Sequence, residues 1–102
     1  MNHEEFIKLY ESSDNKQEDF KYFWYSSYYY EGGITYLMFL ELISDENEYI
    51  NCNWKYYEYP FTYRNKGTLK ITKNDYYPES KYYLCKSEEH FKSMVENILL
   101  LS

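Results

Sequence analysis

The stretch of sequence that decides the fold lies at residues 49–59 and reads YINCNWKYYEY. Two sets of alternating positions run through it, the first apolar and the second mostly polar: Ile50, Cys52, Trp54 and Tyr56 against Asn51, Asn53, Lys55 and Tyr57. Successive side chains of a strand point to opposite faces, so this pattern is typical of a strand with one buried and one solvated face. We therefore expect an antiparallel sheet whose buried face carries the first set.

Turn signals divide the sequence before this stretch into two more strands. Residues 20–31 and 34–43 are rich in aromatic and aliphatic side chains. They are separated by Gly32-Gly33, a pair that suits the positive φ angles of a tight hairpin turn. The polar run Ser44-Asp45-Glu46-Asn47 predicts the next turn.

The sequence after this stretch predicts the rest of the sheet. Pro60 has no N–H, so the strand before it should end there, be bulged or lie at an edge. The Asn65-Lys66-Gly67 segment predicts a three-residue hairpin loop, with glycine at the left-handed position. Strands are expected at residues 68–72 and 81–86, with a loop at residues 75–80 between them.

A helix is expected at each end of the chain. Asn2 and Glu5 form a capping-box-like start for a helix over residues 3–12, which is followed by a loop. Ser87 is placed to cap a second helix, and apolar residues recur through that helix at helical spacing. These residues are Phe91, Met94, Val95, Ile98, Leu99 and Leu101. The expected fold is α+β: a single antiparallel β-sheet meander of about five strands, with both helices packed on one face and the other face left largely to solvent.

Length, charge and cysteine content narrow the class of protein. A chain of 102 residues fits one domain spanning residues 1–102. No apolar stretch reaches the ~20 residues of a membrane span, and the acidic start does not look like a signal peptide. We therefore expect a cytoplasmic protein with no membrane partner. In a reducing cytosol Cys52 and Cys85 should stay unpaired and buried.

Few residues offer catalytic chemistry. His3 and His90 lie at opposite ends of the chain, and His90 is expected near the start of the last helix, in a surface or capping role. Glu31 and Glu58 could meet across strands as a carboxylate pair, but acids at strand ends are ordinarily solvated. No spacing indicates a metal site, a nucleophile or a phosphate-binding loop. We expect a protein that is not an enzyme and has no metal or cofactor.

The tyrosines are the main functional signal. There are 16 of them, in a chain with a single valine and no alanine. Tyrosine offers large, fairly rigid contact area with a hydroxyl for hydrogen bonding, and it is enriched in binding surfaces. The alternative is that tyrosine fills strand positions in a protein from an AT-rich gene. Alternation predicts that some rings emerge opposite Trp54 and Tyr56, and the tyrosines expected to bind a partner are Tyr28, Tyr29, Tyr30, Tyr57 and Tyr59.

Charge is unevenly distributed along the chain. Residues 1–50 hold 11 acids and 3 bases, a net charge of −8, whereas residues 51–102 hold 6 acids and 8 bases, a net charge of +2. The acidic half fits a patch that meets a basic groove on another protein, and Asp45, Glu46 and Glu48 are its expected contact residues. The same acids could equally be ordinary solvated residues.

Three classes of function compete. We favour a small acidic protein that binds and inhibits another protein, in the manner of phage anti-defence inhibitors and toxin-neutralising immunity proteins, which this chain resembles in size and charge only. The second class is a single-stranded nucleic-acid module with tyrosines stacking on bases and Arg64, Lys66, Lys70 and Lys73 holding phosphates. The net charge of −6 argues against nucleic acid as a partner. The third class is a small-ligand or carbohydrate site built on an aromatic platform.

Overall fold

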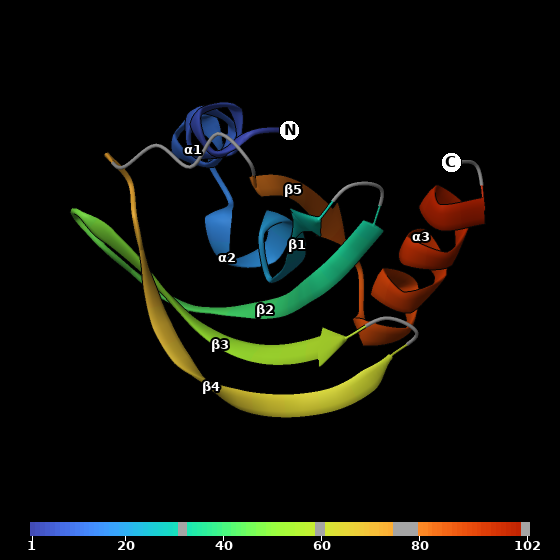
Figure 1. The fold of residues 1–102 in the computed structure, drawn as a ribbon. Helices are drawn as coiled ribbons and strands as arrows, with labels where there is room; N and C mark the ends of the chain where they lie inside the picture. Colours follow the sequence, from blue (N-terminus) through green and yellow to red (C-terminus); the bar gives the residue numbers. More distant parts are fainter. Residues whose placement is uncertain (31–32, 59–60, 75–79, 101–102) are drawn as a thin grey trace.

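The computed structural model describes residues 1–30, 33–58, 61–74 and 80–100; for residues 27–30, 33–36, 80, 99 and 100 we describe the backbone alone. The elements along the chain are α1 (His3–Ser12), α2 (Lys16–Asp19), β1 (Tyr22–Tyr30), β2 (Gly33–Glu46), β3 (Tyr49–Glu58), β4 (Thr62–Thr72), β5 (Ser80–Cys85) and α3 (Glu88–Leu100). The strands form one antiparallel sheet in the order β4-β3-β2-β1-β5 (Figure 1). The predicted α+β class, with five antiparallel strands and a helix towards each end of the chain, is confirmed.

The meander holds for β1–β4, and β5 lies at the opposite edge of the sheet from β4. The last strand pairs with β1, with Tyr22 opposite Cys85 and Ser27 opposite Ser80. β1 is therefore an interior strand, with β2 on one side and β5 on the other. Its consecutive residues Phe23 and Trp24 are both buried, as expected for a strand that is covered on both faces.

The turn predicted at residues 44–47 lies later in the chain. β2 continues through Glu46, and Asn47-Glu48 makes the turn into β3. A register shift between Leu42 and Ser44 leaves Ile43 in a bulge with 47% of its surface exposed. Polar residues can extend β2 here because β3 supplies hydrogen-bond partners. For example, the Asn51 side-chain amide donates to the Ser44 hydroxyl at 2.9 Å. The observed pairing of Tyr30 with Gly33 agrees with the hairpin turn predicted at Gly32-Gly33, although Gly32 itself lies outside the described residues.

The predicted hairpin loop at Asn65-Lys66-Gly67 is wrong, because β4 runs straight through these residues. Gly67 pairs with Trp54 on β3, and the indole lies against the glycine backbone. A Cβ atom at position 67 would lie only 2.8 Å from Trp54 Cζ2. Glycine within a strand often marks such a close approach rather than a turn. The predicted loop at residues 75–80 falls almost entirely outside the described residues.

Substituting Gly67 by alanine tests this contact. Where the backbone conformation suits both residues, Gly→Ala stabilises a protein by about 0.4–1 kcal/mol. Here the new methyl group displaces the Trp54 ring, and we expect a loss of about 1–3 kcal/mol in the free energy of unfolding. Urea denaturation measures the change, with Thr68→Val as the control at an exposed neighbouring position. Stability equal to or above that of the wild type would contradict the contact.

Helix α1 packs on the face of the sheet that the alternation of residues 49–59 predicted to be buried. Its capping box is present: the Asn2 side chain accepts from the Glu5 N–H at 2.8 Å, and the Glu5 carboxylate accepts from the Asn2 N–H at 3.1 Å. Its buried side chains are His3, Phe6, Ile7 and Tyr10. Phe6 stacks on Tyr82, with ring centroids 4.6 Å apart. Phe6, Ile7 and Tyr10 share one core with Ile50 and Cys52, against which Trp54 and Tyr56 also pack.

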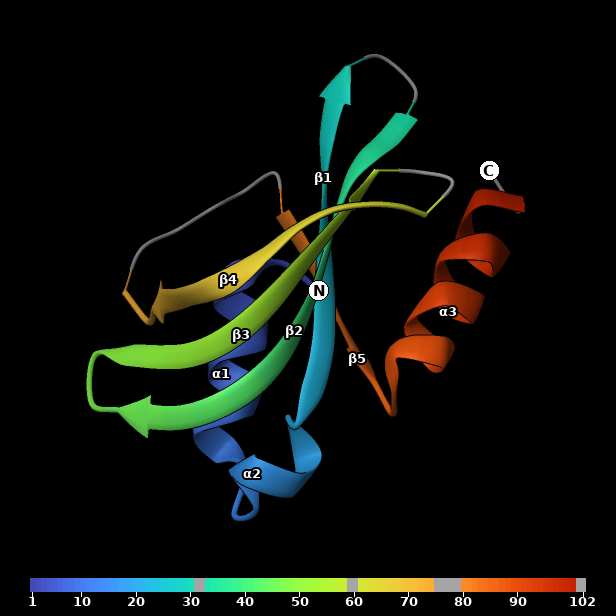
Figure 2. The same cartoon turned by 90° about the horizontal axis from the view of Figure 1, so that it is seen from below.

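Helix α3 packs on the other face, so the expectation of two helices on one face is wrong. Phe91 and Val95 form a separate core with Trp24, Leu37, Phe39 and Tyr57. These strand residues alternate with the residues that face α1: Trp24 follows Phe23 and Leu37 precedes Met38. Figure 2 shows α1 behind strands β2–β4 and α3 at the end of β5. The second face needs cover because several of its residues, such as Trp24 and Phe39, are themselves large and apolar.

Candidate functional site

The fold places Tyr57 inside the protein, which corrects the prediction that it emerges to meet a partner. Its side chain is 6% exposed and packs against Phe91 of α3. Its hydroxyl donates to the Glu88 carboxylate at the start of the same helix. The prediction failed because it assumed an open second face, and α3 covers the part of that face where Tyr57 lies. Burial and the Glu88 carboxylate together raise the pKa of Tyr57.

Three of the other predicted tyrosines, Tyr28, Tyr29 and Tyr30, lie at the far end of strand β1, in the β1–β2 hairpin. The described pairs of β1 with β5 end at Ser27, and those of β2 with β3 end at Tyr36. Tyr28 and Tyr30 pair only across the hairpin, with Ile34 and Gly33. Figure 2 shows this two-stranded end projecting from the sheet. The side chains of Tyr28, Tyr29 and Tyr30, and all of Tyr59, lie outside the described residues.

Strands β2, β3 and β4 bring two of the predicted acidic contact residues, and also Glu58, together with three of the predicted basic residues. The ion pairs are Asp45–Lys73 at 2.7 Å, Glu46–Lys70 at 3.7 Å and Glu58–Arg64 at 2.8 Å. Glu48 and Lys66 have no ion pair within the described part of the chain. Exposed pairs of this kind add little to stability, but each one weakens the local field. The described surface here is therefore a mosaic of both signs and not a single-sign patch.

The most enclosed cation of these ion pairs is Lys73, which follows β4 and contacts Asp45 of β2 and Glu11 of α1. The Lys73 side chain is 10% exposed and also reaches Glu11 at 3.0 Å. Its ammonium lies over the Tyr10 ring, 5.5 Å from the centroid. Burial by itself would raise the pKa of Asp45, but the Lys73 ammonium outweighs it and the pKa is lowered. Burial and the nearby Asp45 carboxylate raise the pKa of Tyr10.

A groove of about 660 Å³ lies on the α3 face of the sheet, where strands β2–β4 meet the start of α3. Polar and charged residues line it together with three aromatic residues: Tyr22, Phe39, Glu41, Asn53, Trp54, Lys55, Lys66, Gly67, Thr68, Ser87 and Glu88. At one side the Lys55 ammonium lies 3.2 Å from the Glu88 carboxylate. Burial alone would raise the pKa of Glu88, but the hydrogen bonds from Tyr57 and Lys55 lower it. The groove borders β4, the edge strand of the sheet.

The two histidines and the two cysteines, whose side chains have the most versatile chemistry, have structural roles. His3 is 1% exposed, with its ring 5.7 Å from that of Tyr82. His90 Nδ1 accepts from the Lys86 N–H at 2.9 Å, and the His90 N–H donates to Ser87 Oγ at 3.0 Å, which places Ser87 as the predicted cap of α3. Cys52 and Cys85 are both unpaired, as predicted, although only Cys52 is fully buried. Burial raises the pKa of each thiol to about 12, so neither is a thiolate at neutral pH.

The described residues contain no group of three or more His, Cys, Asp or Glu side chains that could hold a metal ion. They also contain no helix long and apolar enough to cross a membrane.

Sequence reasoning missed the groove and the Trp54–Gly67 contact beside it. The signal that could have revealed the contact was a lone glycine inside a run with strand-like alternation, which marks a close approach of backbone or ligand. The groove had no sequence signal, because its lining comes from five separate elements (β1–β4 and α3) and from the loop before α3. Comparisons of this chain with protein-family models, with curated proteins and with solved structures found no match.

Proposed function

We propose that this protein is a non-enzymatic inhibitor that binds to another protein. The proposal rests on the roles that the reactive side chains have in the fold. Both histidines and both cysteines have packing or capping roles, while the sheet leaves a groove of mixed polar and aromatic lining beside an edge strand. A groove that mixes aromatic residues with polar and charged side chains, and whose lining includes neither a histidine nor a cysteine, suits recognition better than catalysis.

Binding to single-stranded nucleic acid is the weaker alternative. Three of the four cations proposed to hold phosphates already have carboxylate partners in the protein. A nucleic-acid strand would have to displace those carboxylates, and the chain carries a net charge of −6. A labelled oligonucleotide should therefore bind no more tightly than about 10⁻⁶–10⁻⁴ M at physiological salt.

Affinity capture followed by reconstitution tests the proposal. Tagged protein is used to retain partners from cells that naturally contain it, and each candidate partner is then purified. We expect one partner to lose its activity in proportion to added protein, with an end point at a fixed stoichiometry. Heat-denatured protein is the control. A partner whose activity is unchanged at saturation, or a sub-micromolar and salt-sensitive affinity for the oligonucleotide, would refute the inhibitor proposal.

A further inference from the structure

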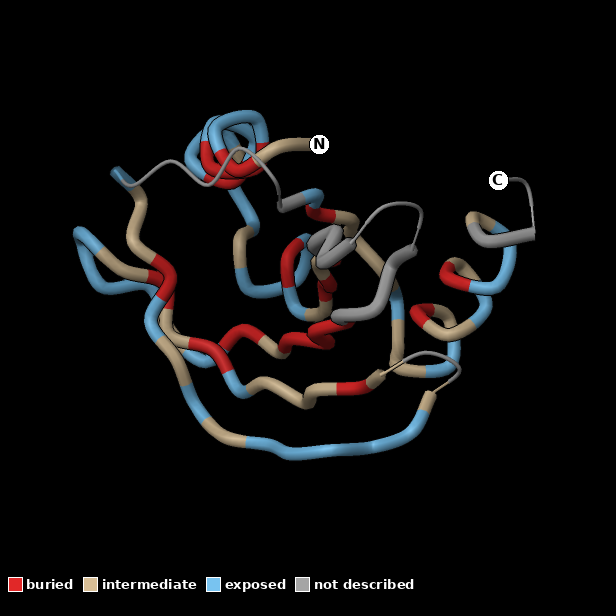
Figure 3. The backbone as a smooth tube through the Cα atoms, in the orientation of Figure 1, coloured by how far each residue is buried: buried red, intermediate tan, exposed pale blue. Residues whose placement is uncertain are grey.

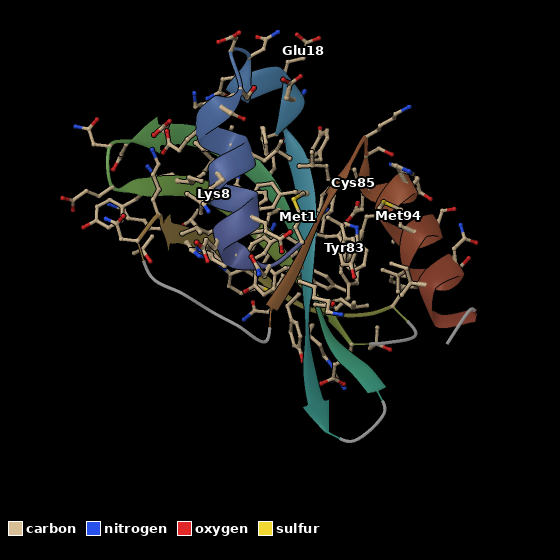
Figure 4. The ribbon with its side chains drawn as sticks, turned by 90° about the horizontal axis from the view of Figure 1, so that it is seen from above. Met1, Lys8, Glu18, Tyr83, Cys85 and Met94 are labelled. Carbon is tan, nitrogen blue, oxygen red and sulfur yellow. The ribbon has the colours of Figure 1, made fainter. Side chains whose placement is uncertain are left out.

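The two edges of the sheet differ in how they are covered. At β5, the Tyr82 N–H donates to the Met1 carbonyl at 2.6 Å, and the Met1 amino group donates to the Tyr82 carbonyl at 3.1 Å. Met1 therefore occupies the outer side of β5, and α1 follows directly (Figure 4). At β4, no other described strand pairs with the outer side. Residues 62–66 of β4 are all exposed, and most of that strand is pale blue in Figure 3.

β4 is a long and positively charged edge strand. Its 11 residues, TYRNKGTLKIT, include three cations and neither an acid nor a proline. An exposed edge offers a row of backbone N–H and C=O groups to which another strand can add. This positive strand stands out in a chain whose net charge is −6.

The side chains along β4 give this edge a specific shape. Lys66 and Thr68 line the groove on the α3 face, and Lys70 follows on the same face. On the opposite face Gly67 has no side chain, so the half-exposed Trp54 ring lies against the strand at that point. An added strand would place the side chain opposite Gly67 beside the indole. The side chain opposite Lys66 would meet an ammonium group that has no ion pair within the described part of the chain. The side chain opposite Lys70 would share that ammonium group with Glu46, which lies 3.7 Å away.

We propose that the β4 edge is a docking site for an extended acidic segment of the partner protein, which adds to the sheet as an antiparallel strand. The segment carries acidic residues opposite Lys66 and Lys70, and an aromatic or large aliphatic residue opposite Gly67. A second copy of this chain is a poorer occupant, because β4–β4 pairing would bring two cationic strands together within two chains that are each net acidic. This inference rests on the proposed function and names the part of the partner that is recognised.

A synthetic peptide tests the edge directly. The probe is acetyl-Ser-Thr-Glu-Val-Thr-Trp-Glu-Val-Thr-amide, in which the Glu-Val-Thr-Trp-Glu core runs antiparallel to residues 66–70. In NMR titrations with ¹⁵N-labelled protein, we expect shifts and slowed amide exchange along β4, with residues 80–85 unchanged. Lys66→Glu with Lys70→Glu should weaken binding at least tenfold. Equal binding of a scrambled peptide, or responses confined to residues outside β4, would overturn the inference.

The captured partner provides the second test. The Lys66→Glu/Lys70→Glu variant should lose at least tenfold in affinity, whereas Lys8→Glu/Lys86→Glu, with the same change in charge away from β4, should bind normally.

Three outcomes separate the edge inference from the proposed function. In the first, the Lys66→Glu/Lys70→Glu variant binds normally and the Tyr28→Ser/Tyr29→Ser/Tyr30→Ser variant loses binding. The edge inference then fails, and the proposed function stands with the end of the β1–β2 hairpin as the binding surface. If Lys66→Ala/Lys70→Ala dimerises in sedimentation, the lysines guard against self-association and the edge inference also fails. If the wild type inhibits no captured protein, the proposed function fails. The peptide titration then still shows whether the β4 edge binds an extended acidic segment.

Discussion

Replacing Phe91 with alanine is expected to lower the free energy of unfolding by about 3–5 kcal/mol. Phe91 is fully buried, and it lies at the centre of the core between α3 and the sheet. Its ring centroid is within 6 Å of four others: Trp24 at 5.5 Å, Phe39 at 5.3 Å, Tyr57 at 5.9 Å and Phe61 at 5.8 Å. Small domains have about 5–15 kcal/mol of stability in all, so this is a large fraction of the total. Thermal unfolding followed by circular dichroism should show a fall in Tm of well over 10 °C.

The control for this substitution lies on the same helix. Met94 is only half-buried, so Met94→Ala should cost clearly less than Phe91→Ala. Milder changes can test whether the two cores are separate. Phe6→Leu and Phe91→Leu act on opposite faces of the sheet, so their effects should add to within about 0.5 kcal/mol. A Phe91→Ala protein that melts within a few degrees of the wild type would mean that α3 does not cover this face.

The protein is expected to lose much of its stability between pH 9 and pH 11. The pKa of the Cys52 thiol rises from its ordinary value of 9.0 to about 12 on burial. Burial also raises the pKa of Tyr10 and Tyr57 above 10.0, with carboxylates nearby adding to the effect. A group with a raised folded-state pKa stabilises the fold fully below its unfolded pKa, and this contribution is lost as pH rises towards the folded value. Each such group costs about 1.4 kcal/mol per pH unit once its unfolded form ionises.

Urea denaturation at a series of pH values measures this loss. We expect the slope of stability against pH to begin near pH 9 with the thiol and to steepen above pH 10, where the tyrosines join it. Tyr57→Phe removes one of these groups, so it should reduce the slope above pH 10 while lowering stability at pH 7 through loss of the Glu88 hydrogen bond. Tyr63→Phe, at a side chain with 50% exposure, is the comparison variant and should change the slope less than Tyr57→Phe does. A flat profile up to pH 11 would contradict the burial of these hydroxyls.

Tertiary structure decided which tyrosines are available and where the charges meet. Alternation in β3 placed Ile50 and Cys52 on a buried face correctly, but it could not show that α3 covers Tyr57 on the other face. The Asp45–Lys73 pair joins residues 28 positions apart, and only the β2–β3–β4 register brings them within 2.7 Å. The identities of Asp45 and Lys73 were visible in the sequence, but their mutual neutralisation was not.

The sequence by itself determined the local features of this protein: the α1 capping box at Asn2, the Ser87 cap of α3, the alternation of β3 and the unpaired cysteines. The two caps and the alternation depend on residues within a few positions of one another, where backbone geometry and side-chain period set the outcome. Tertiary structure alone decided that β5 returns to β1, that the helices cover opposite faces, and that Gly67 lies under Trp54 within a strand and not in a turn. These features depend on which distant surfaces bury each other, and no local pattern encodes that choice.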